Sequence, residues 1–430
     1  MKTNYDTAVI GGGLAGLIAA IKVAQSGRSV VLLEKSSRLG GRAMTNHNNG
    51  VYLNLGGHAL YKAGRANSVL QELGIRVEGG KPSTQMNVIW NKQLVPMGAD
   101  PIGMLKTKLL TWSSKMQLMR LMVKLSRLNA DTIPASSIRE WAEREVQDPM
   151  VRHVFYALCR TATYAFDPDH QLAGPALGQI QRSLKGVIYL HKGWQTIVDQ
   201  LRSKAQQIGV HIESGKSVKE ITHKGNKVTG LELGDGTSIS VTNVISTASP
   251  SETYKLVPGA EATVLKQWKT EAVASMAACL DIGLKKLPVK EHEFALGLDQ
   301  PIFFSNHSAH ATMSDNGAVV VHLIKYNGPG ESDPKADEQQ LLQTMNWLQP
   351  GWENEVLAKQ FLPNITVTQG YPHTGQKSKN IGPNVPGIQG LYVAGDWAGH
   401  GELLADASVA SAVRAAEAIA KHSPSLAAAR

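Results

Sequence analysis

Three glycines at fixed spacing follow the first apolar segment of the chain, and they constrain its fold more than any other feature. The segment Thr7–Ile10 predicts a short buried strand, and Gly11, Gly13 and Gly16 come directly after it in the order G-x-G-x-x-G. Residues 17–25 then predict a helix, and a second apolar strand follows. A strand, a glycine turn, a helix and a strand in this order are typical of a dinucleotide-binding βαβ unit.

Each glycine of this turn has a distinct expected role. Gly11 allows the tight turn, Gly13 lets the backbone approach a pyrophosphate, and Gly16 lets the helix pack closely on the strand. Leu14 and Ala15 lie at the start of the helix, where unpaired N–H groups and the helix dipole favour phosphate. We therefore predict that these residues belong to a dinucleotide site, against the alternative of a merely glycine-rich turn.

The second strand, residues 28–34, ends in an acid and leads into a basic loop. Glu34 has the position, relative to the glycine turn, of a carboxylate that accepts hydrogen bonds from ribose hydroxyls and disfavours a 2′-phosphate. In the loop that Lys35 opens, Gly41 lets the chain run close to a ligand and Arg42 reaches an anion such as a pyrophosphate. A solvated basic loop is the alternative interpretation.

A second glycine-bearing strand end lies near the C-terminus. The segment that ends in Gly395 and Asp396 predicts a strand, and residues 406–421 predict a helix of small side chains. Asp396 is placed to bond a hydroxyl of the ligand or to cap a turn. The helix N-terminus at Asp406 and Ala407 is expected to face the ligand.

Composition excludes several classes of protein. The 430 residues are 42% hydrophobic and 18% charged, which predicts a folded chain of two or three domains. The net charge of +9 is diffuse, so no nucleic-acid partner is expected. Cys159 and Cys279 form no metal-type pair, so we expect neither a metal site nor a disulfide scaffold, but a reducing, cytoplasmic compartment. The sequence has no stretch of ~20 apolar residues, so we expect no transmembrane helix.

The motifs together resemble the FAD-dependent amine oxidase superfamily, which includes monoamine oxidases, protoporphyrinogen oxidases and phytoene desaturases. The resemblance rests on VIGGGLAGLIAA and LLEKSSRLGGR near the N-terminus and on GLYVAGDW near the C-terminus. It implies that Gly57, in a glycine pair after a strand, lies near a flavin, and that the strand around Val218 brackets the adenine. It also implies noncovalent FAD, because no cysteine lies beside the C-terminal motif.

The spacing of the motifs predicts an α/β protein with a Rossmann-type (GxGxxG) FAD-binding domain and an inserted mixed α+β substrate domain. We expect the FAD-binding domain to be discontinuous, over residues 1–80, 195–255 and 385–430. The substrate domain then fills residues 81–194 and 256–384. No second dinucleotide fingerprint is present, so electrons are expected to pass to oxygen or a quinone, and NADH or NADPH is not expected to reduce the flavin.

Three features of the sequence favour a largely hydrophobic substrate over an amine. The strand expected at residues 271–283 has no lysine in its interior, and Leu404 stands where the resemblance implies an aromatic residue. The stretch 101–129 is basic and rich in Leu, Met and Trp, which suits a peripheral membrane contact at the inner face of the membrane, or a substrate tunnel, or an ordinary helix pair. An amine substrate, a redox-neutral isomerase and a non-catalytic FAD-binding protein stay open.

Hydride removal by a flavin needs little acid–base chemistry from the protein, so few catalytic candidates are expected. His58 follows the glycine pair, and His400 follows the C-terminal motif. Tyr61 and Tyr371 are candidates to flank a substrate. A packed, hydrogen-bonding role is the alternative for each histidine.

Overall fold

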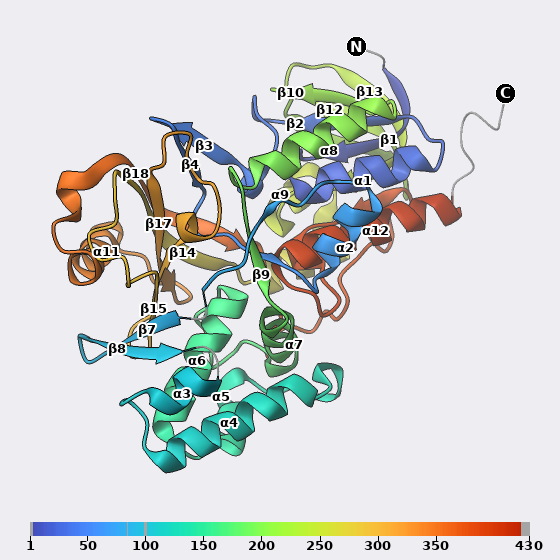
Figure 1. The fold of residues 1–430 in the computed structure, drawn as a ribbon. Helices are drawn as coiled ribbons and strands as arrows, with labels where there is room; N and C mark the ends of the chain where they lie inside the picture. The colour runs from blue at the N-terminus through green and yellow to red at the C-terminus, as the bar shows by residue number, and fades with distance from the viewer. Residues whose placement is uncertain (1–2, 84, 99–100, 423–430) are drawn as a thin grey trace.

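The computed structural model describes residues 3–83, 85–98 and 101–422, and within them the chain forms a mixed α/β fold around two seven-stranded sheets (Figure 1). The N-terminal glycine turn and the C-terminal helix meet beside the first sheet. The second sheet is built from the middle of the chain and carries a group of helices below it in Figure 1.

The first sheet is largely parallel and places both ends of the chain side by side. Its strands are β1 (Asn4–Ile10), β2 (Val30–Glu34), β10 (His211–Ser214), β11 (Val218–Lys224), β12 (Lys227–Leu233), β13 (Ser238–Ser246) and β19 (Leu391–Val393). The order is β10-β2-β1-β13-β12-β11, with β19 paired to β13. All pairs are parallel except β11–β12 and β12–β13. The carboxyl ends of β1, β2 and β19 therefore point to one edge, where ligands of such sheets bind.

Helices cover both faces of this sheet, and β1 is buried from Tyr5 to Ile10. On one face lie α1 (Leu14–Gln25), α2 (Arg65–Glu72), α8 (Gln195–Gln207) and α12 (Leu404–His422). The other face packs against α9 (Pro250–Leu256) and α10 (Val264–Glu271). Every residue of β2 is buried, as expected for a strand between two helical layers.

The second sheet is mostly antiparallel. Its order is β18-β14-β17-β16-β15-β7-β8, and only the β15–β7 pair is parallel. The strands are β7 (Gln85–Trp90), β8 (Gln93–Gly98), β14 (Ser275–Leu284), β15 (Phe294–Gly297), β16 (Ile302–Asn306), β17 (Val319–Asn327) and β18 (Val356–Thr368). Long strands β14 and β18 pair over most of their length, so the sheet is a rigid wall.

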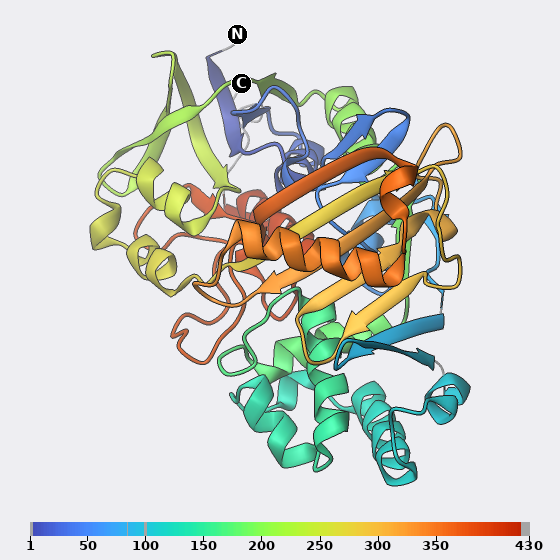
Figure 2. The same cartoon turned by 90° about the vertical axis from the view of Figure 1, so that its left-hand side faces the viewer.

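One helix covers one face of this sheet and a helical group covers the other. Figure 2 shows α11 (Pro334–Leu348) lying across the first face. The other face packs on α3 (Pro101–Lys106), α4 (Trp112–Arg127), α5 (Ile138–Glu145), α6 (Pro149–Thr163) and α7 (Ala173–Leu184). Within the described residues, none of the helices has the length and apolar character needed to cross a membrane.

Two small sheets join the large ones. They are β3 (Thr45–Asn48) with β4 (Val51–Asn54), and β5 (Leu60–Tyr61) with β9 (Val187–Leu190) and β6 (Gly79–Gly80). The division into two domains stays a prediction. One packing contact bears on its boundary: Trp268 of α10 shares a core with Trp397 and the first sheet, although it follows residue 255.

Candidate functional site

A cavity of 570 Å³ runs from the carboxyl edge of the first sheet to the wall of the second. Its volume lies in the range of small-molecule sites, roughly 300–1,000 Å³. Most residues that the sequence predicted as site residues line it together: Gly11, Gly13, Leu14, Ala15, Glu34, Lys35, Gly41, Arg42, Gly57, His58, Gly395 and Asp396. The residues predicted but placed elsewhere are Gly16, Val218, Tyr61, His400, Asp406 and Ala407.

The glycine turn leaves open space into which a ligand could approach the protein backbone closely. A Cβ on Gly13 would point into open space, with only the Gly40 carbonyl oxygen near it, at 3.8 Å. Gly13 has φ −77°, so the backbone itself does not require glycine there. A Cβ on Gly16 would lie 1.8 Å from the Gly11 carbonyl oxygen, which explains its role in packing α1 on β1. The space beside Gly13, at the N-terminus of α1, fits a pyrophosphate.

Glu34 holds the glycine turn against the end of β2. Its carboxylate accepts hydrogen bonds from the backbone N–H groups of Gly12 at 2.7 Å and Ser36 at 2.8 Å. The side chain lines the cavity, and each oxygen keeps a further lone pair. The carboxylate therefore fixes the glycine turn and also faces the cavity.

Replacing Glu34 with alanine is expected to weaken FAD binding about tenfold to a hundredfold. The loss of charge-assisted hydrogen bonds worth roughly 1.5–3 kcal/mol accounts for this size. Glu34→Gln is the matched control, since it keeps one oxygen acceptor and should lose less. Quenching of flavin fluorescence on titration into apoprotein measures the affinities. Equal affinities for the wild type and Glu34→Ala would contradict this role.

Arg42 and Asp396 bind each other at the edge of the cavity. Arg42 Nη1 and Nη2 donate to the two Asp396 carboxylate oxygens at 2.8 and 2.9 Å, and Nη1 also donates to the Val367 carbonyl at 2.8 Å. The Gln369 N–H donates to Asp396 at 2.8 Å. Burial opposes the charge on Arg42, but the attraction and hydrogen bonds of Asp396 outweigh it and raise the pKa of the guanidinium. The pair ties the N-terminal and C-terminal motifs together.

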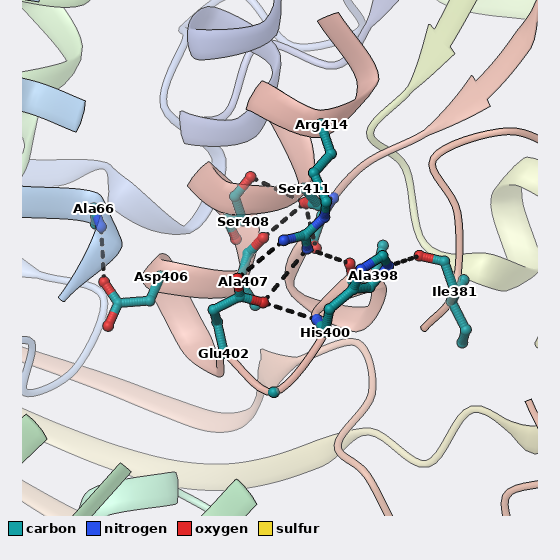
Figure 3. Close-up of polar contacts among 12 residues, drawn as sticks. Ala66, Ile381, Ala398, His400, Glu402, Asp406, Ala407, Ser408, Ser411 and Arg414 are labelled. Atoms are coloured by element: carbon teal, nitrogen blue, oxygen red, sulfur yellow. Dashed lines mark hydrogen bonds and ion pairs between the residues drawn. The ribbon is translucent and has the colours of Figure 1, made fainter. Parts of the chain in front are cut away.

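The first turn of α12 borders the cavity, but through other residues than the two predicted. Asp406 does not line the cavity, and its Oδ1 accepts a hydrogen bond from the Ala66 N–H at 2.8 Å (Figure 3). It thereby caps α2 from another helix. The helix begins at Leu404 rather than at residue 406, so Leu404, Ala405 and Ser408 face the cavity.

His400 also lies away from this cavity. Its backbone N–H donates to Glu402, and its Nε2 contacts the Ile381 carbonyl at 3.1 Å (Figure 3). Glu402 forms an ion pair with Arg414 at 2.9 Å. His400 lines a separate open cavity of 880 Å³ between α7 and the loops that precede α12, which also borders Tyr371. These contacts assign His400 to the bracing of the loop.

Tyr61 is a scaffold contact between β5 and α6. Its hydroxyl donates to the Ala162 carbonyl at 3.0 Å, and burial raises its pKa to about 12. The tyrosine that reaches the cavity is instead Tyr164, whose hydroxyl donates to the Gly57 carbonyl at 2.8 Å. Tyr164 has the left-handed conformation, with φ 56°, at the end of α6. That cap places its ring beside the glycine pair.

The His58 side chain lines the cavity, and its contacts fix the orientation of the ring. Its Nδ1 lies 2.9 Å from the Gly56 carbonyl, and its ring packs edge-on against Trp194, with ring centroids 5.9 Å apart. A carbonyl only accepts, so Nδ1 carries the proton and Nε2 of the neutral ring carries a lone pair. Burial lowers the pKa of His58, which favours this neutral form. The ring can therefore accept a proton or a hydrogen bond.

The wall formed by the second sheet is mostly apolar. Cys279 of β14, Ile324 of β17 and Ile365 of β18 line the cavity opposite the first sheet, together with Leu404. Burial raises the pKa of the Cys279 thiol well above its usual value, so it stays protonated. Among the cavity-lining residues in the described part of the chain, the one lysine is Lys35, which follows β2 at the opposite end. No group of metal-ligating side chains occurs in that part either.

A family model and two characterised proteins match parts of this sequence. The family model described as "Flavin containing amine oxidoreductase" matches residues 14–420. The chain is 27% identical over 190 residues to protoporphyrinogen oxidase 2 of Arabidopsis thaliana, covering 42% of this chain and 37% of that protein. It is 24% identical over 284 residues to 4,4′-diaponeurosporene oxygenase of Staphylococcus aureus, covering 57% of this chain and 56% of that protein.

Solved structures share the fold over nearly the whole chain. An oxidoreductase from Methanosarcina mazei superposes with a TM-score of 0.79 at 20% identity, over 96% of this chain and 100% of that one. A putrescine oxidase bound to putrescine superposes with a TM-score of 0.73 at 15% identity, over 97% of this chain and 99% of that one. At these identities the likeness concerns the fold.

Proposed function

The chain belongs to the family of flavin-containing amine oxidoreductases, and from this premise we propose that it removes a hydride from a largely hydrophobic substrate, in the manner of a desaturase or dehydrogenase. Family membership confirms the resemblance predicted from the motifs. It makes the protein an FAD-dependent oxidoreductase. The substrate and the electron acceptor belong to the proposal.

We place FAD noncovalently in the 570 Å³ cavity, in a Rossmann-type domain with an inserted substrate domain. The space beside Gly13 would hold the pyrophosphate, and Glu34 would meet the adenosine ribose. Asp396, held by Arg42, would bond the middle of the cofactor. The buried, protonated Cys279 supports noncovalent binding, because a thiol attacks as its thiolate.

The chemistry that FAD supplies in this cavity is hydride acceptance. The protein's part is to orient the substrate, exclude water and, where the reaction requires it, hold one proton. His58 suits the last task because its Nε2 keeps a lone pair. Oxygen or a quinone is the proposed acceptor, since the sequence has one dinucleotide fingerprint.

The apolar wall carries the proposal for the substrate. Ile324, Ile365 and Leu404 present hydrocarbon to the cavity where an amine substrate would need polar partners. Contact with such a wall contributes ~25 cal/mol per Å² of apolar surface buried. A long hydrocarbon therefore needs few polar anchors.

Binding to this wall is expected to raise the melting temperature of the FAD-loaded protein. Polyenes and terpenoids should raise it, and small primary amines should not. Ile324→Asn should abolish the rise by placing an unpaired amide in the wall, while Ile324→Val, the matched control, should keep it. Differential scanning fluorimetry measures both. Stabilisation by amines without stabilisation by hydrocarbons would favour an amine oxidase.

We also propose that α3 and α4 touch a membrane surface. Ile102, Trp112 and Val123 are large apolar side chains that are 65%, 68% and 50% exposed. Trp112, Met116 and Val123 form one stripe along α4 at helical spacing. Exposed basic residues flank it, namely Lys108, Arg120 and Arg127. Lys115 and Lys124 are engaged elsewhere, with the Leu105 carbonyl and Glu145. An apolar stripe beside cations suits an anionic interface.

Wild-type protein is expected to sediment with vesicles that contain anionic lipid. The double change Trp112→Ser and Val123→Ser should strongly reduce sedimentation, because it removes the two most exposed side chains of the apolar stripe and keeps the charges. Leu184→Ser is the control, since Leu184 is an exposed apolar residue outside this stretch. Wild-type protein that stays in the supernatant, or a double variant that sediments like it, would make α3 and α4 scaffold only.

A further inference from the structure

Asp281, in the interior of β14, is a fully buried carboxylate that the proposed reaction does not use. Its Oδ1 lies 2.6 Å from Nδ1 of His322, which is also fully buried. Its Oδ2 accepts hydrogen bonds from the Gly56 N–H at 3.1 Å and from Gln360 Nε2 at 3.0 Å. A charge at this depth is costly unless its partners satisfy it, and here three distant segments of chain converge to do so.

One of those segments is the loop that presents His58 to the cavity. Asp281 anchors Gly56 through its N–H, and the carbonyl of the same residue holds His58 Nδ1 at 2.9 Å. Tyr164 fixes the next carbonyl, that of Gly57. A Cβ on Gly56 would lie 2.8 Å from Cys279 Sγ, so the loop packs tightly on β14. The loop has little freedom to move while these contacts hold.

We propose that Asp281 is a positioning residue for His58, with His322 holding the Asp281 carboxylate in place. The carboxylate fixes the residue whose carbonyl selects the Nδ1–H form of His58, and its negative charge acts on the His58 ring through space. The inference rests on the proposed function, which places His58 beside the bound cofactor.

The charged and titratable groups around His58 determine whether its pKa should rise or fall when the Asp281 charge is removed. They come from the elements packed around it: Arg42 of the loop after β2, Tyr164 at the end of α6, Cys279 and Asp281 of β14, His307 in the turn after β16, and His322 of β17. Burial lowers the pKa of His58 most, and His322 and Arg42 lower it further. The Gly56 hydrogen bond and the Asp281 charge raise it. Removing the Asp281 charge should therefore lower the pKa of His58.

Nitrogen-15 NMR of histidine-labelled, FAD-loaded protein tests the inference without a substrate. The His58 signal is assigned by its disappearance in His58→Gln. Wild-type His58 should show protonated Nδ1 and unprotonated Nε2 at neutral pH. In Asp281→Asn its pKa should fall, because the negative charge that favours the protonated ring is gone. Gln360→Met, the matched control, removes one donor and keeps the charge, so it should not lower this pKa.

An unchanged His58 pKa in Asp281→Asn, or a wild-type His58 protonated at Nε2, would overturn the inference. If Asp281→Asn does not fold, His322→Asn and His322→Leu replace it. Asparagine keeps a donor to Asp281 and should preserve the His58 tautomer, whereas leucine should not, and equal His58 spectra for both would also overturn the inference. If these spectra are as expected but no hydrophobic substrate is oxidised, only the proposed function is contradicted.

Discussion

Gly13→Val is expected to weaken FAD binding strongly while the apoprotein still folds. The valine side chain would occupy the space beside the turn, where the nearest atom to a Cβ is the Gly40 carbonyl oxygen at 3.8 Å. The φ of −77° at Gly13 suits any L-residue, so the change should cost the fold little. We expect the affinity to fall by roughly a hundredfold or more, about 2.7 kcal/mol.

Flavin content after purification and titration of apoprotein with FAD measure this effect. Gly13→Ala is the graded control, since one carbon fills less of this space and should weaken binding less than valine. The circular dichroism and melting temperature of the apoproteins should match. Valine-substituted protein that binds FAD as tightly as the wild type would show that the pyrophosphate lies elsewhere.

Arg42→Ala is expected to destabilise the protein more than Asp396→Asn. Without Arg42, the Asp396 carboxylate, whose side chain is 3% exposed, keeps only the Gln369 N–H as a donor. An unpaired buried charge costs several kcal/mol, and because Arg42 is 41% exposed, solvent screening reduces this to about 2 kcal/mol. Asp396→Asn leaves no buried charge, and the freed guanidinium can turn to solvent.

Melting temperatures of the two apoproteins compare these changes directly. Arg42→Ala should melt several degrees below the wild type, and Asp396→Asn should lie between them. Arg42→Lys is a further control, because it keeps the charge and loses the two-pronged contact. A larger loss in Asp396→Asn than in Arg42→Ala would mean that the carboxylate contributes through other contacts than the ion pair.

Short motifs in the sequence predicted the part of the site in which we place the cofactor. The glycine turn, the acid at Glu34 and the strand before Asp396 each depend on residues close together in the chain, and the structure brings them to one cavity. The strand expected at 271–283 corresponds to β14, Ser275–Leu284. Short-range patterns of this kind report on turns and elements before any tertiary contact is known.

Such local patterns do not predict contacts between residues that lie far apart in the chain. Tyr164 and Trp194 reach the cavity from the end of α6 and the start of α8, and Asp281 meets His322 across two strands. Nothing in their local sequence marks them. Asp406 shows a different limit: the helix begins two residues earlier than predicted, and each residue turns the side-chain direction by about 100°. Its carboxylate therefore caps α2 instead of facing the cavity.

Anaerobic mixing of the FAD-loaded protein with candidate substrates tests the central claim most directly, with flavin absorbance as the readout. The account predicts that polyenes, terpenoids or similar hydrophobic C–H donors bleach the flavin rapidly, and that small primary amines, NADH and NADPH do not. Rapid bleaching by simple amines, with none by the hydrophobic panel, would contradict the assignment of the apolar wall to the substrate.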